Sequence, residues 1–191
     1  MTFRPRVDVA LVHAPVINRQ GEVIGSAVTN LDLHDIARAC RTFGVDTYWV
    51  ITPFARQRKL SEQIISHWLA GHGKKANPDR GEALSLVRIQ ADLDGVIEQV
   101  RAKWRQKPVV VATCAGEGQE EMISYSALRD RIRQEAPVLL LFGTAWGLAP
   151  QVYTRVTATL PPVHGFGDYN HLSVRSAASI ILDRLLGNRE N

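Results

Sequence analysis

Two glycine-rich loops in the last third of the chain carry the residue types best suited to holding a small molecule. Gly143 to Pro150 follows an apolar run, Pro137 to Phe142, and His164 to His171 leads into an apolar helix that begins near Ser173. Glycine has no Cβ, so main-chain N–H and C=O groups can approach a ligand closely. Nucleotide folds of the Rossmann type place such a loop after the first strand, whereas both loops here lie late in the chain. They predict a ligand site built mostly from backbone.

Two side chains of the second loop have the chemistry of a proton acceptor. Asp168 lies between a glycine and a tyrosine, and its carboxylate is the better acceptor on chemical grounds. His171 titrates in a range suited to neutral pH, although a histidine beside a helix start is also explained as a hydrogen-bonding structural residue. The sequence leaves the choice between them open.

Other kinds of site find little support. Gly116-Glu117-Gly118 has the form of a phosphate-binding turn, but its neighbouring glutamates would repel phosphate. A Walker A lysine is absent. The six histidines and two cysteines lack metal-ligand spacing, so no metal site is expected. Cys114 is better explained as a small buried residue than as a thiol nucleophile.

The elements that must position the two loops alternate between strands and helices. Apolar and β-branched runs predict strands at 7–12, 46–51, 84–89, 109–113, 138–142 and 156–160. Helical spacing predicts helices from about 32 to 43, 60–69, 92–105, 126–134 and from 173 onward. This alternation predicts an α/β fold, with a mostly parallel sheet covered by helices on both faces. At 191 residues a single domain over 1–191 is expected.

Charge indicates a polyanionic partner. The net charge is +4 and the isoelectric point is near 9.3, which favours contact with nucleic acid over a neutral partner. Lys74 and Lys75 lie in a polar segment, 71–81, which is expected to be a loop and would make an RNA-facing lip. The alternative is that the basic side chains are simply solvated.

The expected location is the cytoplasm. No apolar stretch is long enough to cross a bilayer, and the first residues lack the apolar core of a signal peptide. Cys40 and Cys114 lie far apart in unlike contexts, so a disulfide framework is not expected.

Three segments, in order along the chain, resemble motifs of the SPOUT (α/β-knot) RNA methyltransferases. Asp32 to Arg38, closing with Phe43-Gly44, resembles the first motif. Phe142 to Leu148 resembles the second, and Asn170 to Ala178 resembles the third. The resemblance covers most of the chain and implies a C-terminal trefoil knot, S-adenosylmethionine as cofactor and RNA (tRNA or rRNA) as substrate. It also implies a homodimer whose active sites are completed across the interface.

Candidate cofactor-binding residues follow from the resemblance, one position at a time. They lie in the second and third motifs and at the end of the strand before them: Thr113, Cys114, Ala115, Leu141, Phe142, Gly143, Thr144, Gly147, Leu148, Gly165, Tyr169, Asn170, Leu172 and Ser173. Arg38 matches the first-motif arginine that contacts the target nucleotide in ribose-methylating relatives; a surface arginine near Asp35 is the other interpretation. Arg38, Asp168 and His171 are therefore the candidate catalytic residues.

The sequence also departs from the family pattern. Ribose methylators usually carry a glutamate in the second motif, where this chain has Thr144-Ala145-Trp146, and Asp32 replaces the first-motif asparagine. These changes make base methylation, as in the tRNA guanine-N1 branch, at least as consistent as ribose methylation. A non-catalytic RNA-binding or ribosome-assembly protein on the same fold is the alternative function.

Overall fold

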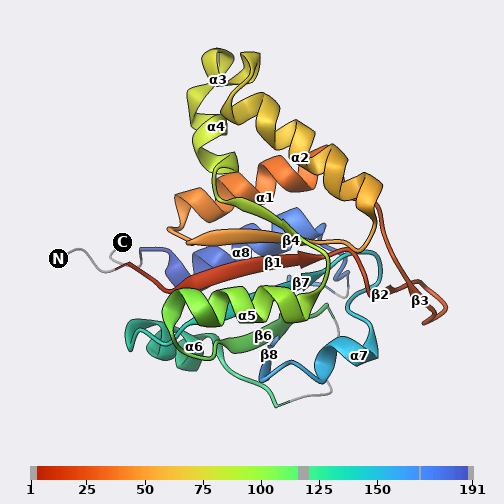
Figure 1. Ribbon diagram of the computed structural model, residues 1–191. Coiled ribbons are helices and arrows are strands. Elements are labelled where there is room, and N and C mark those ends of the chain that lie inside the picture. The colour runs from red at the N-terminus through yellow and green to blue at the C-terminus, as the bar shows by residue number, and fades with distance from the viewer. Residues whose placement is uncertain (1–3, 116–120, 168, 189–191) are drawn as a thin grey trace.

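A six-stranded, fully parallel sheet forms the centre of the computed structural model, which describes residues 4–115, 121–167 and 169–188 (Figure 1). The spatial order is β5-β4-β1-β7-β6-β8. The bounds are β1 (Val7–Val12), β4 (Thr47–Ile51), β5 (Val87–Gln90), β6 (Val109–Thr113), β7 (Val138–Gly143) and β8 (Ala158–Leu160). All six predicted strands are confirmed, and so is the parallel α/β architecture.

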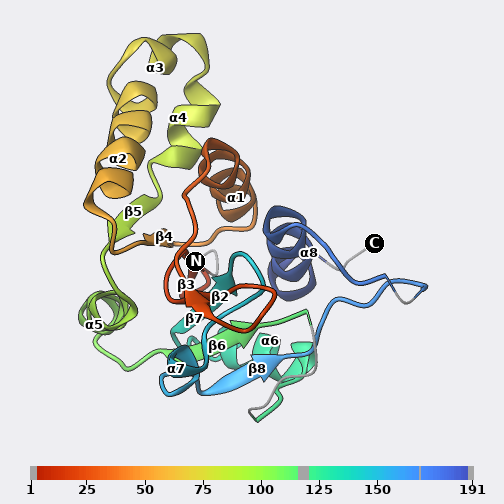
Figure 2. The same cartoon turned by 90° about the vertical axis from the view of Figure 1, so that its right-hand side faces the viewer.

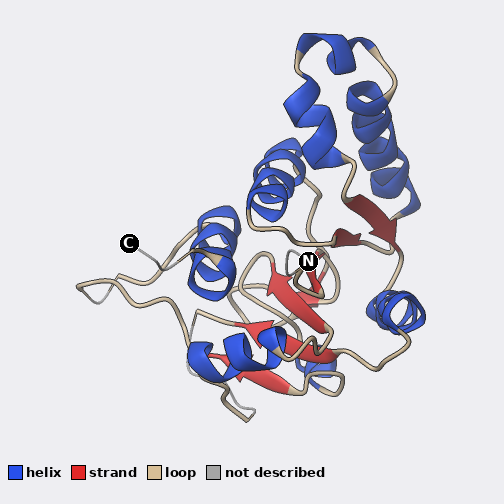
Figure 3. Ribbon diagram, turned by 90° about the vertical axis from the view of Figure 1, so that its left-hand side faces the viewer, coloured by secondary structure: helices blue, strands red, loops and turns tan. Residues whose placement is uncertain are grey.

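Helices cover both faces of the sheet, as its apolar composition requires. Alternate residues of β1 point to opposite faces, Val9 and Leu11 into one core and Ala10 and Val12 into the other. The first core is closed by α1 (Asn30–Thr42), α6 (Tyr125–Arg133) and α8 (Val174–Leu186), and the second by α5 (Leu93–Trp104) and the short α7 (Pro150–Tyr153) (Figure 3).

Helix α8 is a core helix. Its apolar stripe of Ala178, Ile181, Leu182 and Leu185 is buried in the first core. The helix packs beside α1, a neighbour far away in the sequence (Figure 2). The apolar side of α8 is therefore occupied within the chain.

Local sequence explains where the helices begin and end. The Thr29 hydroxyl caps α1 by accepting a hydrogen bond from the Asp32 amide at 3.1 Å. Gly44 ends the same helix with φ +74°, a conformation that glycine adopts without strain. Ser173 caps α8 in the same way, accepting from the Ser176 amide at 3.2 Å.

Helices α2 (Ala55–Leu69), α3 (His72–Ala76) and α4 (Pro78–Leu84) form an arm that stands away from the sheet (Figure 1). The prediction of a polar loop at 71–81 is wrong here. Asn77 caps α4 through its side chain, which accepts from the Arg80 amide at 3.0 Å, and Pro78 occupies the first helical turn. Helix α4 is only seven residues long, too short to show a helical repeat of apolar residues, and its start is marked by these capping residues instead.

A small antiparallel hairpin, β2 (Val16–Ile17) and β3 (Val23–Ile24), follows β1 and was not predicted. Its strands are two residues long, too short for an alternating pattern. Within the described part of the chain, no helix has the length and apolar character needed to span a membrane.

Candidate active site

The carboxyl ends of the central strands meet at one edge of the sheet, where open α/β folds bind ligands. Thr113 ends β6 and Gly143 ends β7, and the two strands are direct neighbours. The Thr113 hydroxyl donates to the Leu141 carbonyl at 2.9 Å and ties the strands together at this edge. The two glycine-rich loops leave the sheet here.

The loop after β7 is tight because its backbone folds back on itself. A Cβ on Gly143 would lie 2.7 Å from the Leu148 nitrogen, a backbone atom that cannot move aside cheaply. Gly147 has φ +115°, which favours glycine strongly. Both glycines are therefore required by the loop itself, and the loop forms a rigid wall.

The β2–β3 hairpin packs against this wall. The Ile17 amide donates to the Gly147 carbonyl at 3.0 Å, and the Trp146 amide donates to the Ile17 carbonyl at 3.0 Å. The Ala149 amide donates to the Pro15 carbonyl at 3.2 Å. Segments more than a hundred residues apart in sequence thus form one surface.

A buried polar chain links the hairpin segment to the same wall. The Thr144 hydroxyl donates to the Val12 carbonyl at 3.1 Å and lies 2.6 Å from the Ser26 hydroxyl, which in turn lies 3.0 Å from His13 Nδ1. The Ser26 hydroxyl also lies 3.4 Å from the His13 carbonyl, so Ser26 links the ring and backbone of His13 to Thr144.

His13 is fully buried, and its Nε2 has no hydrogen-bond partner in the described part of the chain. Burial lowers the pKa of His13 from 6.5 to about 4; the charge of Asp32 and a backbone hydrogen bond with Ala27 favour protonation but are outweighed. At neutral pH the ring is uncharged. The ring contacts Ser26 through Nδ1, and its Nε2 has no partner among the described residues at the end of β1.

The last loop, which connects β8 to α8, lies on the other side of the site. The Asn170 side chain donates to the Ala115 carbonyl at 2.7 Å, which joins the third-motif loop to the end of β6. The Cys114 thiol lies 3.9 Å from the Leu160 carbonyl. No backbone N–H or C=O group from 162 to 167 or 169 to 172 makes a backbone hydrogen bond to another described residue. Within the described part of the chain, these groups are therefore unpaired along the backbone.

Aromatic side chains gather where the loops meet. The Trp146 and His171 rings have centroids 6.3 Å apart, and those of Tyr169 and His171 are 5.3 Å apart. The Arg19 guanidinium lies 5.9 Å from the Trp146 ring. Trp146 is 55% exposed and Tyr169 80% exposed, so this aromatic cluster presents flat apolar faces to solvent.

The structure brings most predicted cofactor residues to this edge, but their side chains differ in what they can offer. Leu141, Phe142 and Leu148 are buried in the cores, so only their backbone faces the site. The hydroxyls of Thr144 and Ser173 are engaged by Val12 and the α8 cap. A Cβ added to Gly165 would meet no atom within 4 Å, so packing does not require glycine there. Leu172 is 45% exposed and Tyr169 more so.

Of the three predicted catalytic residues, Arg38 and His171 lie in different parts of the described chain. Arg38 is exposed on α1. It lies about two turns after the N-terminus of that helix, which is the end that adjoins the site. It lines a groove of about 290 Å³ between α1 and α8, with Asp35 and Ser179. His171 belongs to the aromatic cluster, and Asp168 lies outside the described residues. Arg175 faces Asp35 at 3.5 Å and Asp32 at 3.8 Å.

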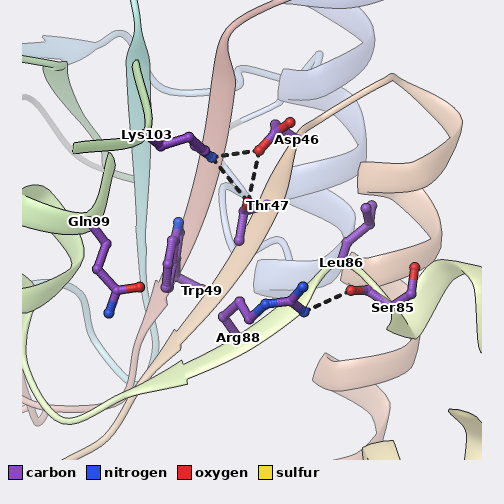
Figure 4. Close-up of a pocket in the computed structure, with 8 residues that line it drawn as sticks. All are labelled: Asp46, Thr47, Trp49, Ser85, Leu86, Arg88, Gln99 and Lys103. Atoms are coloured by element: carbon purple, nitrogen blue, oxygen red, sulfur yellow. Dashed lines mark hydrogen bonds and ion pairs between the residues drawn. The ribbon is translucent and has the colours of Figure 1, made fainter. Parts of the chain in front are cut away.

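A different cavity, of about 370 Å³, lies at the amino end of the sheet (Figure 4). Lys103 bridges Asp8 and Asp46 at 2.6 Å each, and the Trp49 and Trp104 indoles donate to Asp8 at 3.0 and 3.1 Å. Burial disfavours the charged form of Asp46, but the hydrogen bond from Lys103 outweighs it and holds the pKa of Asp46 below its ordinary value. These charges are mutually satisfied, so the cluster is structural.

Comparison with known proteins decides the family. A family model described as SAM-dependent RNA methyltransferase matches residues 6–187. The chain belongs to this family. The resemblance to SPOUT methyltransferases is thereby confirmed, and S-adenosylmethionine is the cofactor of the family to which the chain belongs.

The methyltransferase relatives include a tRNA (guanine-N(1)-)-methyltransferase of Oleidesulfovibrio alaskensis, 46% identical over 93% of this chain. That match covers 41% of the relative, so the chain spans about two fifths of its length. An uncharacterized protein of Aquifex aeolicus is 39% identical over 94% of this chain and 87% of its own length.

A solved structure shares the fold of this chain. The SpoU methyltransferase AviRb of Streptomyces viridochromogenes, in complex with the cofactor AdoMet, has a TM-score of 0.55 at 18% identity. The alignment covers 97% of this chain and 58% of that one.

Sequence reasoning did not predict that His13, Ser26, Arg19 and Trp146 lie at the candidate site. One signal was present, because His13 directly follows a buried strand, and such a residue falls at the carboxyl edge of a parallel sheet. No sequence pattern predicted the β2–β3 hairpin, which brings Ser26 and Arg19 to the site. Among the described residues, no group of three or more histidine, cysteine or acidic side chains is placed to hold a metal ion.

Proposed function

We propose that this chain transfers a methyl group from S-adenosylmethionine to a nucleotide of tRNA or rRNA, with the cofactor held at the carboxyl edge of the sheet. The observation that carries the proposal is that the end of β6, the loop after β7 and the loop before α8 meet at this edge. All three segments lie within the match to one methyltransferase family. The cofactor supplies an electrophilic methyl carbon, so the protein has to hold donor and acceptor in line, exclude water and accept any proton released.

The residues present fit such a group. The loop after β7 contributes a rigid wall whose amides at Thr144, Trp146 and Gly147 are already bonded within the protein. The last loop contributes the unpaired backbone groups that an adenosine and an amino-acid moiety need. The predicted cofactor-binding set is therefore retained, with backbone rather than side-chain contacts assigned to Leu141, Phe142 and Leu148.

The acceptor nucleotide is assigned to the aromatic cluster. Trp146 and Tyr169 expose ring faces beside the cofactor loops, and Arg19 places a positive charge over one of them. Stacking on aromatic side chains is how proteins hold unpaired RNA bases. Asp168 and His171 remain the two candidate proton acceptors, and whether the accepting atom belongs to a base or to a ribose is left open.

A homodimer is part of the proposal. Arg38 is remote from the site of its own chain and lines the groove between α1 and α8, so it would reach a target nucleotide only if it came from a second copy. The C-terminal knot and a single methyltransferase domain over 1–191 complete the proposal. The strand order and the packing of α8 against α1 and α6 are consistent with both.

Calorimetric titration with S-adenosylmethionine and S-adenosylhomocysteine tests the site, using Asn170→Ala and, as a matched control, Gln106→Ala on the amino side of the sheet. Asn170→Ala should weaken binding about tenfold, which corresponds to about 1.4 kcal/mol, because it unties the last loop from β6. Gln106→Ala should bind like wild type. Absence of binding to a folded wild-type protein at millimolar ligand would refute the cofactor site.

Transfer of labelled methyl groups to tRNA and rRNA tests turnover separately. Incorporation supports the methyltransferase. Cofactor and RNA binding without any incorporation would favour the alternative, a non-catalytic RNA-binding or ribosome-assembly protein on the same fold.

A further inference from the structure

The positive charge of the chain is concentrated in one place. The helical arm, residues 55–84, contains six lysines and arginines against three acidic residues, whereas the rest of the chain contains seventeen against sixteen. The arm therefore carries nearly all of the net charge.

The tip of the arm is built around Trp68. Gly73 of α3 lies so close that a Cβ there would be 2.6 Å from the indole ring, and the Arg80 guanidinium lies 4.7 Å from the ring centroid on another side. Gly73 is buried, while its neighbours Lys74 and Lys75 are exposed and form no ion pair with any described residue. Packing thus fixes α3 and presents both ammonium groups to solvent.

Helix α2 extends this charge toward the sheet. Arg56, Lys59, Gln63 and His67 are all exposed and recur at spacings of three and four residues, so they share one face of the helix. All four carry N–H donors, and none is acidic. The stripe runs about 16 Å along the helix axis, long enough to follow two or three consecutive phosphates of a nucleic-acid strand.

The inner end of the stripe lies beside the candidate active site. Helix α2 begins after β4, at the carboxyl edge of the sheet, and the ring of Phe54 at its N-cap packs against Gly25 in the hairpin segment. The hairpin carries Arg19, which lies over Trp146 of the cofactor loop. In Figure 1, α2 starts at the end of the sheet at which β2 and β3 lie and runs upward and back to α3 and α4.

We propose that this basic track, from Arg19 along Arg56, Lys59, Gln63 and His67 to Lys74 and Lys75, binds the phosphate backbone of the RNA whose reacting nucleotide occupies the aromatic cluster. The inference rests on the proposed function. A linear row of donors leading into the site fits an extended polyanion, and phosphate contacts position a nucleic acid without reading its sequence. The arm is thus the part of the chain that holds the RNA backbone while the reacting nucleotide occupies the aromatic cluster.

The experiment compares two double variants of the full chain that change charge equally. Lys74→Glu/Lys75→Glu alters the tip, and Lys107→Glu/Arg131→Glu alters two exposed basic residues at the amino end of the sheet. Binding of fluorescently labelled bulk tRNA is measured by anisotropy at several salt concentrations, and S-adenosylmethionine binding by calorimetry. The tip variant should bind tRNA at least tenfold more weakly than the control variant. Its log Kd should also depend less steeply on log salt, since each lost phosphate contact lowers the slope by roughly 0.7 to 0.9.

If both variants lost the same tRNA affinity, or if the tip variant kept wild-type tRNA affinity, the arm would not be the RNA-binding surface. The proposed function would still stand. A wild-type protein that binds S-adenosylmethionine but no RNA would overturn both. Anionic vesicles are the second probe: tip-dependent binding to them, with tRNA binding unchanged, would assign the track to a membrane surface and overturn the proposal. Cofactor affinity should remain the same in both variants.

Discussion

The two ends of the sheet differ in how completely their buried polar groups are paired. At the amino end, Asp8 is fully buried and satisfied by Lys103 and two indoles. At the carboxyl end, His13 is equally buried but keeps an unpaired nitrogen, and the last loop leaves its backbone groups unbonded to the described residues. The amino-end cluster is thus fully paired, whereas the carboxyl end keeps polar groups without a partner among the described residues. Four predictions test that division, from the largest expected effect to the smallest.

Removing the buried carboxylate should cost the most stability. Asp8→Ala leaves two indole N–H groups without their acceptor and the Lys103 ammonium with Asp46 as its ion-pair partner, and breaking a buried pair costs about 3–5 kcal/mol. Urea unfolding measures the loss, with Asp130→Ala, in an exposed pair with Arg133, as a control expected to change little. If the folded Asp8→Ala protein also lost S-adenosylmethionine affinity, the amino-end cluster would not be purely structural.

Acid should destabilise the carboxyl end through His13. The folded pKa of His13, about 4, lies below its unfolded value of 6.5, so the unfolded state binds the proton first and stability falls as pH drops from about 6.5 to 4. The full loss is about 3 kcal/mol. His13→Gln should lower the free energy of unfolding at pH 7 and flatten its dependence between pH 6.5 and 4, as measured by urea unfolding. An unchanged pH slope would show that other groups govern this range.

Trp146→Ala should weaken RNA binding with little effect on the fold. Its exposed ring offers stacking to a base, a contact worth about 1–3 kcal/mol. Anisotropy with labelled tRNA measures the change. Wild-type tRNA affinity in Trp146→Ala would remove the aromatic cluster from the RNA surface.

The paired substitutions Gly143→Ala and Gly165→Ala should give the smallest effects and sharpen the distinction within the site. A Cβ at Gly143 meets the Leu148 backbone, and such overpacking costs about 1–3 kcal/mol. A Cβ at Gly165 meets no atom within 4 Å, so the stability of that variant should match wild type. If Gly165→Ala nevertheless weakens cofactor binding in calorimetry, a ligand rather than the protein occupies that space.

Local patterns were sufficient for the six strands of the main sheet and for its long helices. Unbroken apolar runs such as Val138 to Phe142 are typical of a parallel sheet covered on both faces. The order of strands and helices along the chain follows from the same patterns. The resemblance in three motifs predicted the family, and the comparison confirmed it. The arm was misread because α3 and α4 are short helices fixed by caps and by Trp68 rather than by an apolar stripe.

By itself, the sequence determined which residues end the strands and where glycine permits a tight loop, because burial periodicity and backbone conformation are properties of neighbouring residues. Only the tertiary structure decided what those ends meet. Ser26 reaches Thr144, and Asn170 reaches Ala115, across 118 and 55 residues. Arg38, by contrast, lines the groove between α1 and α8 with Asp35 and Ser179. Contacts between distant segments depend on the packing of the whole chain, and no local pattern encodes them.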